Sequence, residues 1–180
     1  NRVSGTIDYF ISNTSDLQKP EDYGVKSGWG MFRVRGEIPS LFTGEEDKRA
    51  MFFTDGQTLN LDKIDDQSNG YFVEKWTNLT DAGETASNTA DGGVNTDYPL
   101  FRLADVYLMR AEAKFRSGDV DGALTDINEL RNKRHVSTYK KEELTLEKIY
   151  NERGYEFYWD GPSRRNDMVR FNRYCEARYE

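Results

Sequence analysis

Several residue types are scarce in this sequence, and each shortage excludes a class of protein. Cys175 is the single cysteine, so no disulfide can form within the chain. No apolar run approaches the roughly 20 residues that a membrane-spanning helix needs, and the mean hydropathy is −0.87. No glycine-rich phosphate loop or dinucleotide fingerprint is present either. We therefore expect a chain without a membrane span and without a cofactor.

Basic residues are fewer than acidic ones, 25 against 32, which gives a net charge of −7. Nucleic acids and anionic membrane surfaces both select a basic patch on their partner, so neither is an expected partner of this chain. The acidic excess lies in residues 1–97, which hold 9 Lys+Arg against 17 Asp+Glu, whereas residues 98–180 hold 16 against 15. This difference predicts two regions with different roles.

Aromatic residues, in contrast, are plentiful, at 13% of the chain. They bury a large area per residue, so a core can form although 36% of the residues are hydrophobic. A length of 180 residues suits one domain. The sequence begins at Asn1 with neither an initiator Met nor a signal peptide, and we expect it to be a mature form or a fragment.

Residues 1–97 consist of short apolar segments separated by turn sequences such as Asp55-Gly56 and Asn69-Gly70. Residues 29–34 and 71–73 have strand character, and residues 51–53 form another apolar-aromatic run. From residue 77 to 97 the sequence is rich in Thr, Ser, Asn, Asp, Ala and Gly, which predicts a long solvated loop. This region is therefore expected to be rich in loops, with a few short strands.

Residues 98–180 show helical periodicity instead. A first helix is predicted to start with Pro99 in its first turn and to end at Gly118. Asp119 is placed to cap a second helix. A third is predicted from about Thr145 to residue 160, and a fourth after Pro162. The apolar face of the first helix is predicted to comprise Leu100, Leu103, Tyr107, Leu108, Ala111 and Phe115.

The first two helices, joined by Ser-Gly-Asp, form a hairpin of the kind from which tetratricopeptide-like repeats are built. One hairpin cannot bury both of its faces, so other parts of the protein must pack against it. The predicted fold class is mainly α, with a tetratricopeptide-like helical core at residues 98–180 and a loop-rich, aromatic front half at residues 1–97. Both regions are expected to be parts of one larger domain.

The helical half resembles the SusD/RagB family of bacterial nutrient-binding outer-membrane lipoproteins, in several motifs that keep the family's order. These are YPLFRLADVYLMRAEA at 98–113, GD at 118–119, AL at 123–124, INELR at 127–131, LTLEKIYNER at 144–153, EF at 156–157, WDG at 159–161 and RRNDMVRF at 164–171. The front half is similar more loosely, through GWG at 28–30, Phe42 before Asp47 and Arg49, and YF at 71–72 before KW at 75–76. The resemblance implies that this chain is the later part of a longer family member.

The resemblance also implies a function. Proteins of this family capture glycans at the cell surface, pass them to a TonB-dependent transporter of the SusC type, and generally have no catalytic activity. It further implies a surface-facing lipoprotein of the outer membrane, attached only through a lipid anchor outside this chain. We therefore expect a non-enzymatic protein with an oligosaccharide and a transporter as partners.

Charged residues of the helices are interpreted as structural. Arg102, Asp105, Arg110 and Glu112 have the i,i+3 and i,i+4 spacing of pairs on one helix face. A denser group is predicted to form an ion-pair network that fixes the registry of two helices; its members are Glu152, Arg153, Glu156, Arg164, Arg165, Asp167 and Arg170.

Other polar motifs predict neither a catalytic nor a metal site. Residues 45–47 (EED) are interpreted as a solvated turn, not as a pair of glycosidase carboxylates. His135 has no Ser or Asp beside it in a triad-like motif and is expected to end a helix. Residues 119–122 begin like a calcium loop, but Leu124 and Leu130 stand where such a loop needs Gly and Glu.

Aromatic side chains of the front half are the candidates for glycan binding, because the C–H faces of sugar rings pack on Trp or Tyr. Trp29 lies between two glycines, Tyr23 precedes it in the same loop, and Tyr71 and Trp76 border another loop. We rank Trp29 first and Tyr23 second. The alternative is a helical-repeat module that binds proteins and has no small-molecule site, which predicts these aromatics buried and a flat apolar patch on the surface.

Overall fold

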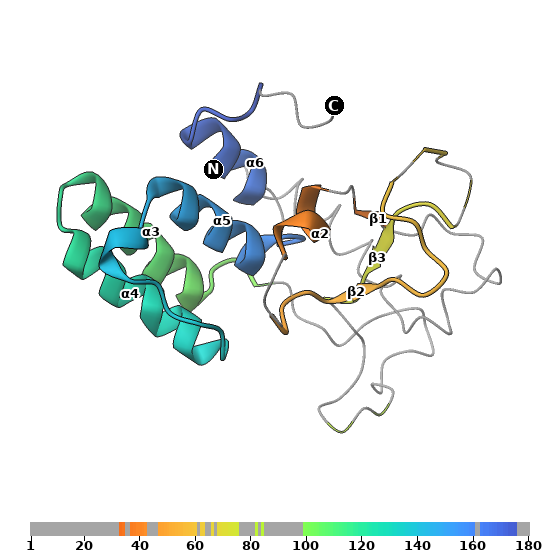
Figure 1. Ribbon diagram of the computed structural model, residues 1–180, viewed down its shortest axis with the longest axis horizontal. Helices are drawn as coiled ribbons and strands as arrows, with labels where there is room; N and C mark the ends of the chain where they lie inside the picture. Colours follow the sequence, from red (N-terminus) through yellow and green to blue (C-terminus); the bar gives the residue numbers. More distant parts are fainter. Residues whose placement is uncertain are drawn as a thin grey trace. The chain divides into compact units, whose positions relative to one another are not determined.

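The computed structural model describes residues 33–34, 37–42, 47–60, 62–63, 66, 68–75, 82, 84, 99–160 and 163–175. The chain divides into two compact units. The sheet unit comprises Asn1–Pro39 and Met51–Tyr98, and the helical unit comprises Ser40–Ala50 and Pro99–Glu180. Figure 1 shows the helices and strands that the described residues form. The predicted fold class, mainly α with a few short strands in the front half, is confirmed.

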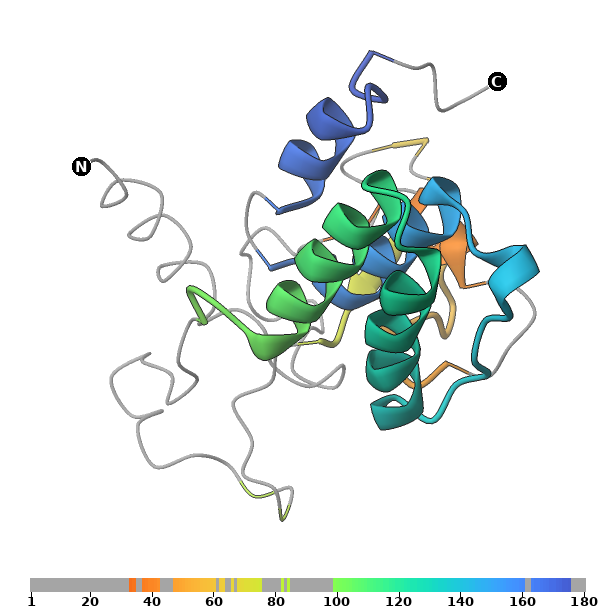
Figure 2. The ribbon, with the colours of Figure 1, turned by 90° about the vertical axis from the view of Figure 1, so that its left-hand side faces the viewer.

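A hairpin of α3 (Leu103–Arg116) and α4 (Val120–Lys133) dominates the helical unit, and Figure 2 shows the two helices side by side. Gly118, just after α3, has a φ of 91°, a conformation that favours glycine. Asp119 caps α4, because its carboxylate accepts a hydrogen bond of 2.9 Å from the backbone N–H of Gly122. The predicted hairpin and both of its end signals are confirmed.

The start of α3 differs from the prediction, which placed Pro99 in the first helical turn. Arg102 is still extended, with φ −123° and ψ 147°, and the helix begins one residue later. Leu100 and Leu103, predicted to lie on the apolar face, are 58% and 70% exposed. The guanidinium of Arg102 binds the carboxylate of Glu156, 54 residues further along, and this tertiary contact holds the residue before α3 in its extended conformation.

Two more α-helices and a 3-10 helix follow the hairpin in this unit. α5 (Leu146–Phe157) contacts α3, and α6 (Ser163–Arg170) contacts α5. The side chain of Thr145 caps α5 by accepting a hydrogen bond from the N–H of Lys148. A short 3-10 helix, η1 (Lys141–Glu143), precedes α5 and contacts α4. The predicted third and fourth helices are thereby confirmed.

The hydrophobic core of the helical unit lies where α3, α4 and α5 meet. Each helix supplies one apolar stripe, as expected for amphipathic helices that share a core. The buried members are Ala104, Leu108, Ala111, Ala123, Ile127, Leu130, Leu144, Ile149 and Phe157. On another side of α3, Leu103, Val106 and Met109 remain exposed at three-residue steps.

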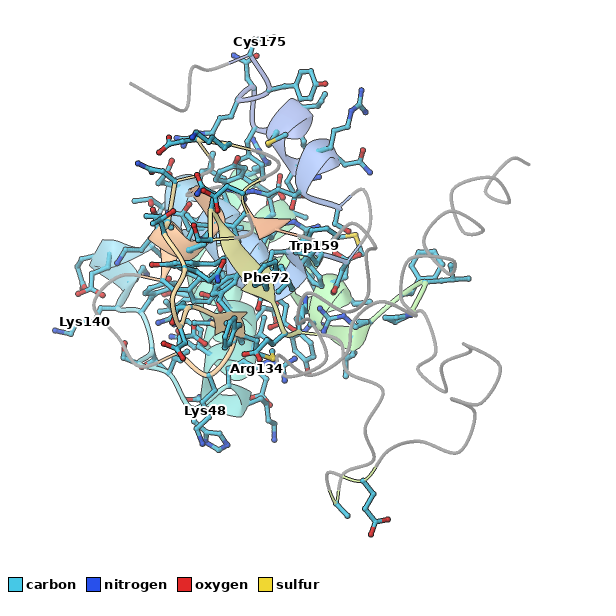
Figure 3. The ribbon with its side chains drawn as sticks, turned by 90° about the vertical axis from the view of Figure 1, so that its right-hand side faces the viewer. Lys48, Phe72, Arg134, Lys140, Trp159 and Cys175 are labelled. Atoms are coloured by element: carbon cyan, nitrogen blue, oxygen red, sulfur yellow. The ribbon has the colours of Figure 1, made fainter. Side chains whose placement is uncertain are left out.

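The sheet unit contains β1 (Arg33–Val34), β2 (Phe52–Phe53) and β3 (Tyr71–Val73), which pair antiparallel in the order β1-β3-β2. Phe72 lies in the central strand, where Figure 3 labels it, and it is buried. A turn follows β2, in which the N–H of Gln57 donates to the carbonyl of Thr54 and Gly56 has a φ of 68°. The strand predicted at residues 71–73 and the turn predicted at Asp55-Gly56 are confirmed.

In the predicted loop of residues 77–97, the structure describes Ala82 and Glu84, and both are exposed. The remainder of that segment lies outside the described residues. Among the helices that are described, none combines the length and the hydrophobicity required to span a bilayer.

Candidate functional site

Of the four aromatic residues predicted to bind glycans, the structure describes Tyr71. It begins β3 opposite Val34 of β1 and is half-buried. Trp29, Tyr23 and Trp76 lie outside the described residues. The role of all four residues stays a prediction.

The helical unit contains a cluster of carboxylates and guanidinium groups around α5. Glu152 is fully buried and accepts hydrogen bonds from Arg49 Nη1 (2.8 Å) and Arg131 Nη1 (2.5 Å). The hydroxyl of Tyr139 donates to the same carboxylate at 3.4 Å. Burial, and next the charge of Glu152, raise the pKa of Tyr139 well above its usual value. Both oxygens of Glu152 are therefore occupied by donors of this unit.

Glu156, one helical turn further along α5, is the second centre of the cluster. It accepts hydrogen bonds from Arg102 Nη1 (2.8 Å), Arg134 Nη2 (2.6 Å) and, at 3.4 Å, Arg49 Nη1. Burial raises its pKa, but the hydrogen bonds and charges of Arg134 and Arg102 outweigh burial and hold the pKa below its usual range. A carboxyl that acts as a general acid needs a raised pKa, so this residue has the character of a structural anion.

A second branch of the cluster joins three helices. Arg153 on α5 binds Asp167 on α6 at 2.7 Å and Asp105 on α3 at 2.9 Å. Arg170 on α6 binds both Asp167, at 2.6 Å, and Glu112 on α3, at 2.9 Å. Guanidinium groups that bridge carboxylates of different helices fix how the helices lie along one another. The predicted network between α5 and α6 is confirmed for Arg153, Asp167 and Arg170, and it reaches a third helix. Arg164 instead donates to the carbonyl of Tyr150, and Arg165 lies over the ring of Tyr174.

The predicted pairing within α3 is largely wrong. Arg110 binds Asp126 on α4 at 2.7 Å, and Asp105 binds Arg153 on α5. Glu112 keeps an i,i+4 pair with Arg116 beside its contact with α6. The i,i+4 spacing places charges on one helix face, but in a packed unit that face also meets charged residues of neighbouring helices.

The turn predicted at residues 45–47 is confirmed at Asp47, whose carbonyl accepts a hydrogen bond from the N–H of Ala50, but this residue is not solvated. Glu45 and Glu46 lie outside the described residues. The side chain of Asp47 is 10% exposed and binds Arg49 through both oxygens, with Nε–Oδ1 at 3.0 Å and Nη2–Oδ2 at 2.7 Å. The hydroxyl of Tyr158 on the helical side donates to the backbone carbonyl of Arg49 at 2.6 Å. The segment Ser40–Ala50 thus supplies the guanidinium that enters between Glu152 and Glu156.

Sequence reasoning missed Arg49, Arg131 and Arg134 as members of the cluster. Buried carboxylates require buried cations, yet the sequence does not reveal which of the 25 basic residues approach them. The sequence signal that was available for Arg49 is its position after Phe42 and Asp47, a spacing that is part of the family resemblance.

Neither the cluster nor its surroundings resembles a metal centre. Within the described residues, no group of three or more His, Cys, Asp or Glu side chains is arranged to hold a metal ion. His135 follows the C-cap of α4 with a φ of 57° and is exposed.

A pocket of about 240 Å³ adjoins the cluster, and all of its lining residues belong to the helical unit. The rings of Phe42 and Tyr155 pack together in its wall, with centroids 5.1 Å apart. Aromatic walls with a few polar groups are typical of small-molecule sites. Its lining includes Phe42, Asp47, Tyr139, Lys148, Asn151 and Tyr155.

The sequence pattern of the SusD family matches residues 14–180. This chain belongs to the SusD family. Starch-binding protein SusD of Bacteroides thetaiotaomicron is 40% identical over 121 residues, which are 67% of this chain and 21% of that protein. A solved SusD superfamily protein of Bacteroides vulgatus ATCC 8482 has a TM-score of 0.56 and 23% identity, over 78% of this chain and 34% of that chain.

Membership of the SusD family confirms the resemblance found in the sequence. The match to the solved SusD superfamily protein concerns the fold alone, because the two sequences are 23% identical. The chain spans 21% of the length of its curated SusD relative.

Proposed function

We propose that this chain takes part in the non-catalytic capture of an oligosaccharide at the bacterial cell surface. The observation that carries the proposal is its 40% identity to Starch-binding protein SusD over 121 residues. The proposal extends glycan binding from that relative to this chain.

The aromatic front half supplies the physical means of capture. We assign this role to Trp29 and Tyr23, followed by Tyr71 and Trp76, because the C–H faces of sugars pack on Trp and Tyr rings while the polar tips of these side chains bind hydroxyls. Neighbouring Asn, Asp and backbone groups of this region add further hydrogen-bonding partners.

The non-catalytic part of the proposal is supported by the state of the carboxylates in the helical unit. Glycosidases hydrolyse their substrates with two free carboxyl groups on either side of the scissile bond. Glu152 and Glu156 are each bound by at least two guanidinium groups instead. We further propose that the captured glycan passes to a SusC-like TonB-dependent transporter, and that a lipid anchor outside this chain holds the protein at the outer membrane.

Calorimetric titration of the full-length protein with a panel of oligosaccharides tests the proposal. We expect saturable binding that Trp29→Ala or Tyr23→Ala weakens by about 1 kcal/mol or more, the scale of a lost aromatic contact. Tyr174→Ala is the control, because Tyr174 is an aromatic residue that is already 50% exposed beyond α6. The same mixtures, followed by chromatography, should contain the oligosaccharides at their original length.

Each outcome has a distinct meaning. Binding that neither substitution weakens would keep glycan capture and move the site away from Trp29 and Tyr23. Shortened products would overturn the non-catalytic assignment. Absence of binding to every glycan would leave the alternative, a module that binds proteins alone, as the better reading.

One observation favours that alternative. Phe101 is 86% exposed, and Leu103, Val106 and Met109 form an exposed apolar row on α3. Exposed apolar patches mark sites of protein association. The variant Val106→Glu separates the two functions, since it should disturb association with a protein while leaving oligosaccharide affinity unchanged.

A further inference from the structure

The pocket of the helical unit contains polar groups that the fold itself does not use. Asn151 on α5 is half-buried and lines the pocket, and its side-chain amide makes no hydrogen bond with any described residue. The hydroxyl of Tyr155, one turn further along, likewise has no hydrogen-bond partner in the described part of the chain. An amide and a hydroxyl offer both donors and acceptors, which matches the requirement of a sugar hydroxyl.

Lys148 supplies the third such group. Its ammonium lies 3.9 Å from Glu143 Oε2, beyond hydrogen-bond distance, and 4.5 Å from the centroid of the Tyr139 ring. The contact with Tyr139 is a cation–π interaction, which orients the ammonium without using its N–H donors for a conventional hydrogen bond. Up to three donors therefore remain for a ligand in the pocket.

The other charges of the lining are balanced within the unit. Asp47 is bound through both oxygens by Arg49. Arg131 is bound to the buried carboxylate of Glu152. Lys148 is the remaining charged lining residue, and its ammonium has the Glu143 carboxylate as a counter-charge at 3.9 Å. With each lining charge facing an opposite charge, the site suits a neutral ligand rich in hydroxyl groups.

Size and shape restrict the ligand further. Pockets for drug-sized molecules measure about 300–1,000 Å³, whereas this pocket measures about 240 Å³. The wall formed by Phe42 and Tyr155 is apolar, and the C–H face of one sugar ring is the part of a glycan that packs on such a wall.

We propose that this pocket, lined by Phe42, Lys148, Asn151 and Tyr155, binds one neutral pyranose ring of the captured glycan. The inference rests on the proposed function and adds a subsite built from residues of the helical unit, none of which is among the four aromatic residues predicted to bind glycans. Asn151 and Lys148 bind hydroxyls of the ring, and Phe42 packs against its C–H face.

Two matched pairs of variants of the full-length protein test the subsite. Asn151→Ala is compared with Asn132→Ala, which removes an exposed asparagine of α4. Lys148→Ala is compared with Lys140→Ala, whose side chain is exposed and points away from the protein in Figure 3. Each variant is titrated with the oligosaccharide that the wild-type protein binds best in the panel, and its fold is checked by thermal unfolding.

We expect Asn151→Ala and Lys148→Ala each to weaken binding about threefold to tenfold, the effect of losing one or two hydrogen bonds, while both controls stay within twofold of the wild type. Asn151→Leu, which keeps the branched shape of the side chain and removes its hydrogen-bonding groups, should also weaken binding. If the wild-type protein binds the oligosaccharide and every pocket variant has the same affinity as its control, the subsite is overturned and the proposed function remains intact. Wild-type protein that binds no glycan in the panel would overturn the proposed function, and the subsite with it.

Discussion

Replacing Glu152 by Gln should destabilise the protein more than any exposed substitution on the same helix. The carboxylate is fully buried and accepts charge-assisted hydrogen bonds from Arg49 and Arg131, whose side chains are 7% and 6% exposed. Glutamine keeps the volume of the side chain, so no cavity forms. It removes the negative charge and presents an N–H₂ group to a guanidinium, so the buried Arg131 loses its ion pair with Glu152, whereas Arg49 keeps its pairs with Asp47 and Glu156.

The magnitude follows from this geometry. Removing one partner of a buried ion pair costs about 3–5 kcal/mol, because the remaining charge is stranded in a medium of low dielectric constant. We expect the free energy of unfolding of Glu152→Gln to fall by that amount. The assay is urea unfolding followed by circular dichroism at 222 nm, with a comparison of the denaturant slopes to confirm that the same transition is observed.

Glu147→Gln is the matched control for this experiment. Glu147 lies in the first turn of the same helix and pairs with Arg173, but both side chains are substantially exposed. Such a surface pair contributes about 0–1 kcal/mol. We infer that the cluster around Glu152 is a major determinant of stability because it is buried. Equal losses of stability in the two variants would show this inference to be wrong.

Three further changes have definite expected outcomes. Asp119→Ala removes the cap of α4 and should lower the free energy of unfolding by about 1 kcal/mol in urea titrations. The pKa of Glu156 is depressed in the folded protein, so the stability that it contributes is present above its unfolded pKa of about 4.3 and is lost as the pH falls through its lower folded pKa. The free energy of unfolding, measured between pH 7 and pH 3, should show this loss. Glu156→Gln should reduce the slope of the free energy of unfolding against pH. Gly154→Ala places a Cβ 2.8 Å from a terminal methyl carbon of Leu41, which must shift; because alanine also gains about 1 kcal/mol of helix propensity inside α5, the net loss should be about 1 kcal/mol or less.

These three predictions have their own contradicting outcomes. Asp119→Asn should retain most of the capping energy, and equal losses for Ala and Asn would argue against a cap. An unchanged pH slope in Glu156→Gln would mean that other carboxylates govern acid unfolding. The double variant Gly154→Ala with Leu41→Ala should lose less stability than the two single variants lose together, because the alanine methyl then has room. If the two losses simply added, the close contact between residues 154 and 41 would not be the cause of the destabilisation.

Local signals in the sequence were sufficient for most of the helical unit. Gly118 and Asp119 predict where α3 ends and α4 begins, because the requirements for φ and for capping are properties of one or two residues. Thr145 predicts the start of α5 for the same reason. The start of α3 was predicted wrongly, because Arg102 is held by Glu156, a residue far away in the sequence.

Long-range pairing also explains which parts of the site escaped prediction. The spacing of Glu152 and Glu156 indicates one helix face, but Arg49 meets Glu152 across 103 positions of sequence, and no periodicity encodes that contact. The pocket lining was not predicted either, because Phe42 and Asn151 line the same cavity only as a result of tertiary packing. The aromatic platform of Trp29 and Tyr23 rests on composition and resemblance alone.

The helical unit is discontinuous in sequence, and this has a consequence for how the chain folds and diverges. Met51–Tyr98 leaves the unit after Ala50 and returns to it at Pro99, so it acts as a closed loop between Arg49 and the helices. During synthesis Arg49 emerges about 100 residues before its carboxylate partner, which delays completion of the cluster. Closing such a loop costs only about 0.6 kcal/mol more for each doubling of its length. A change in the length of the intervening segment outside β2 and β3 should therefore alter the stability of the helices and their ionic cluster only slightly.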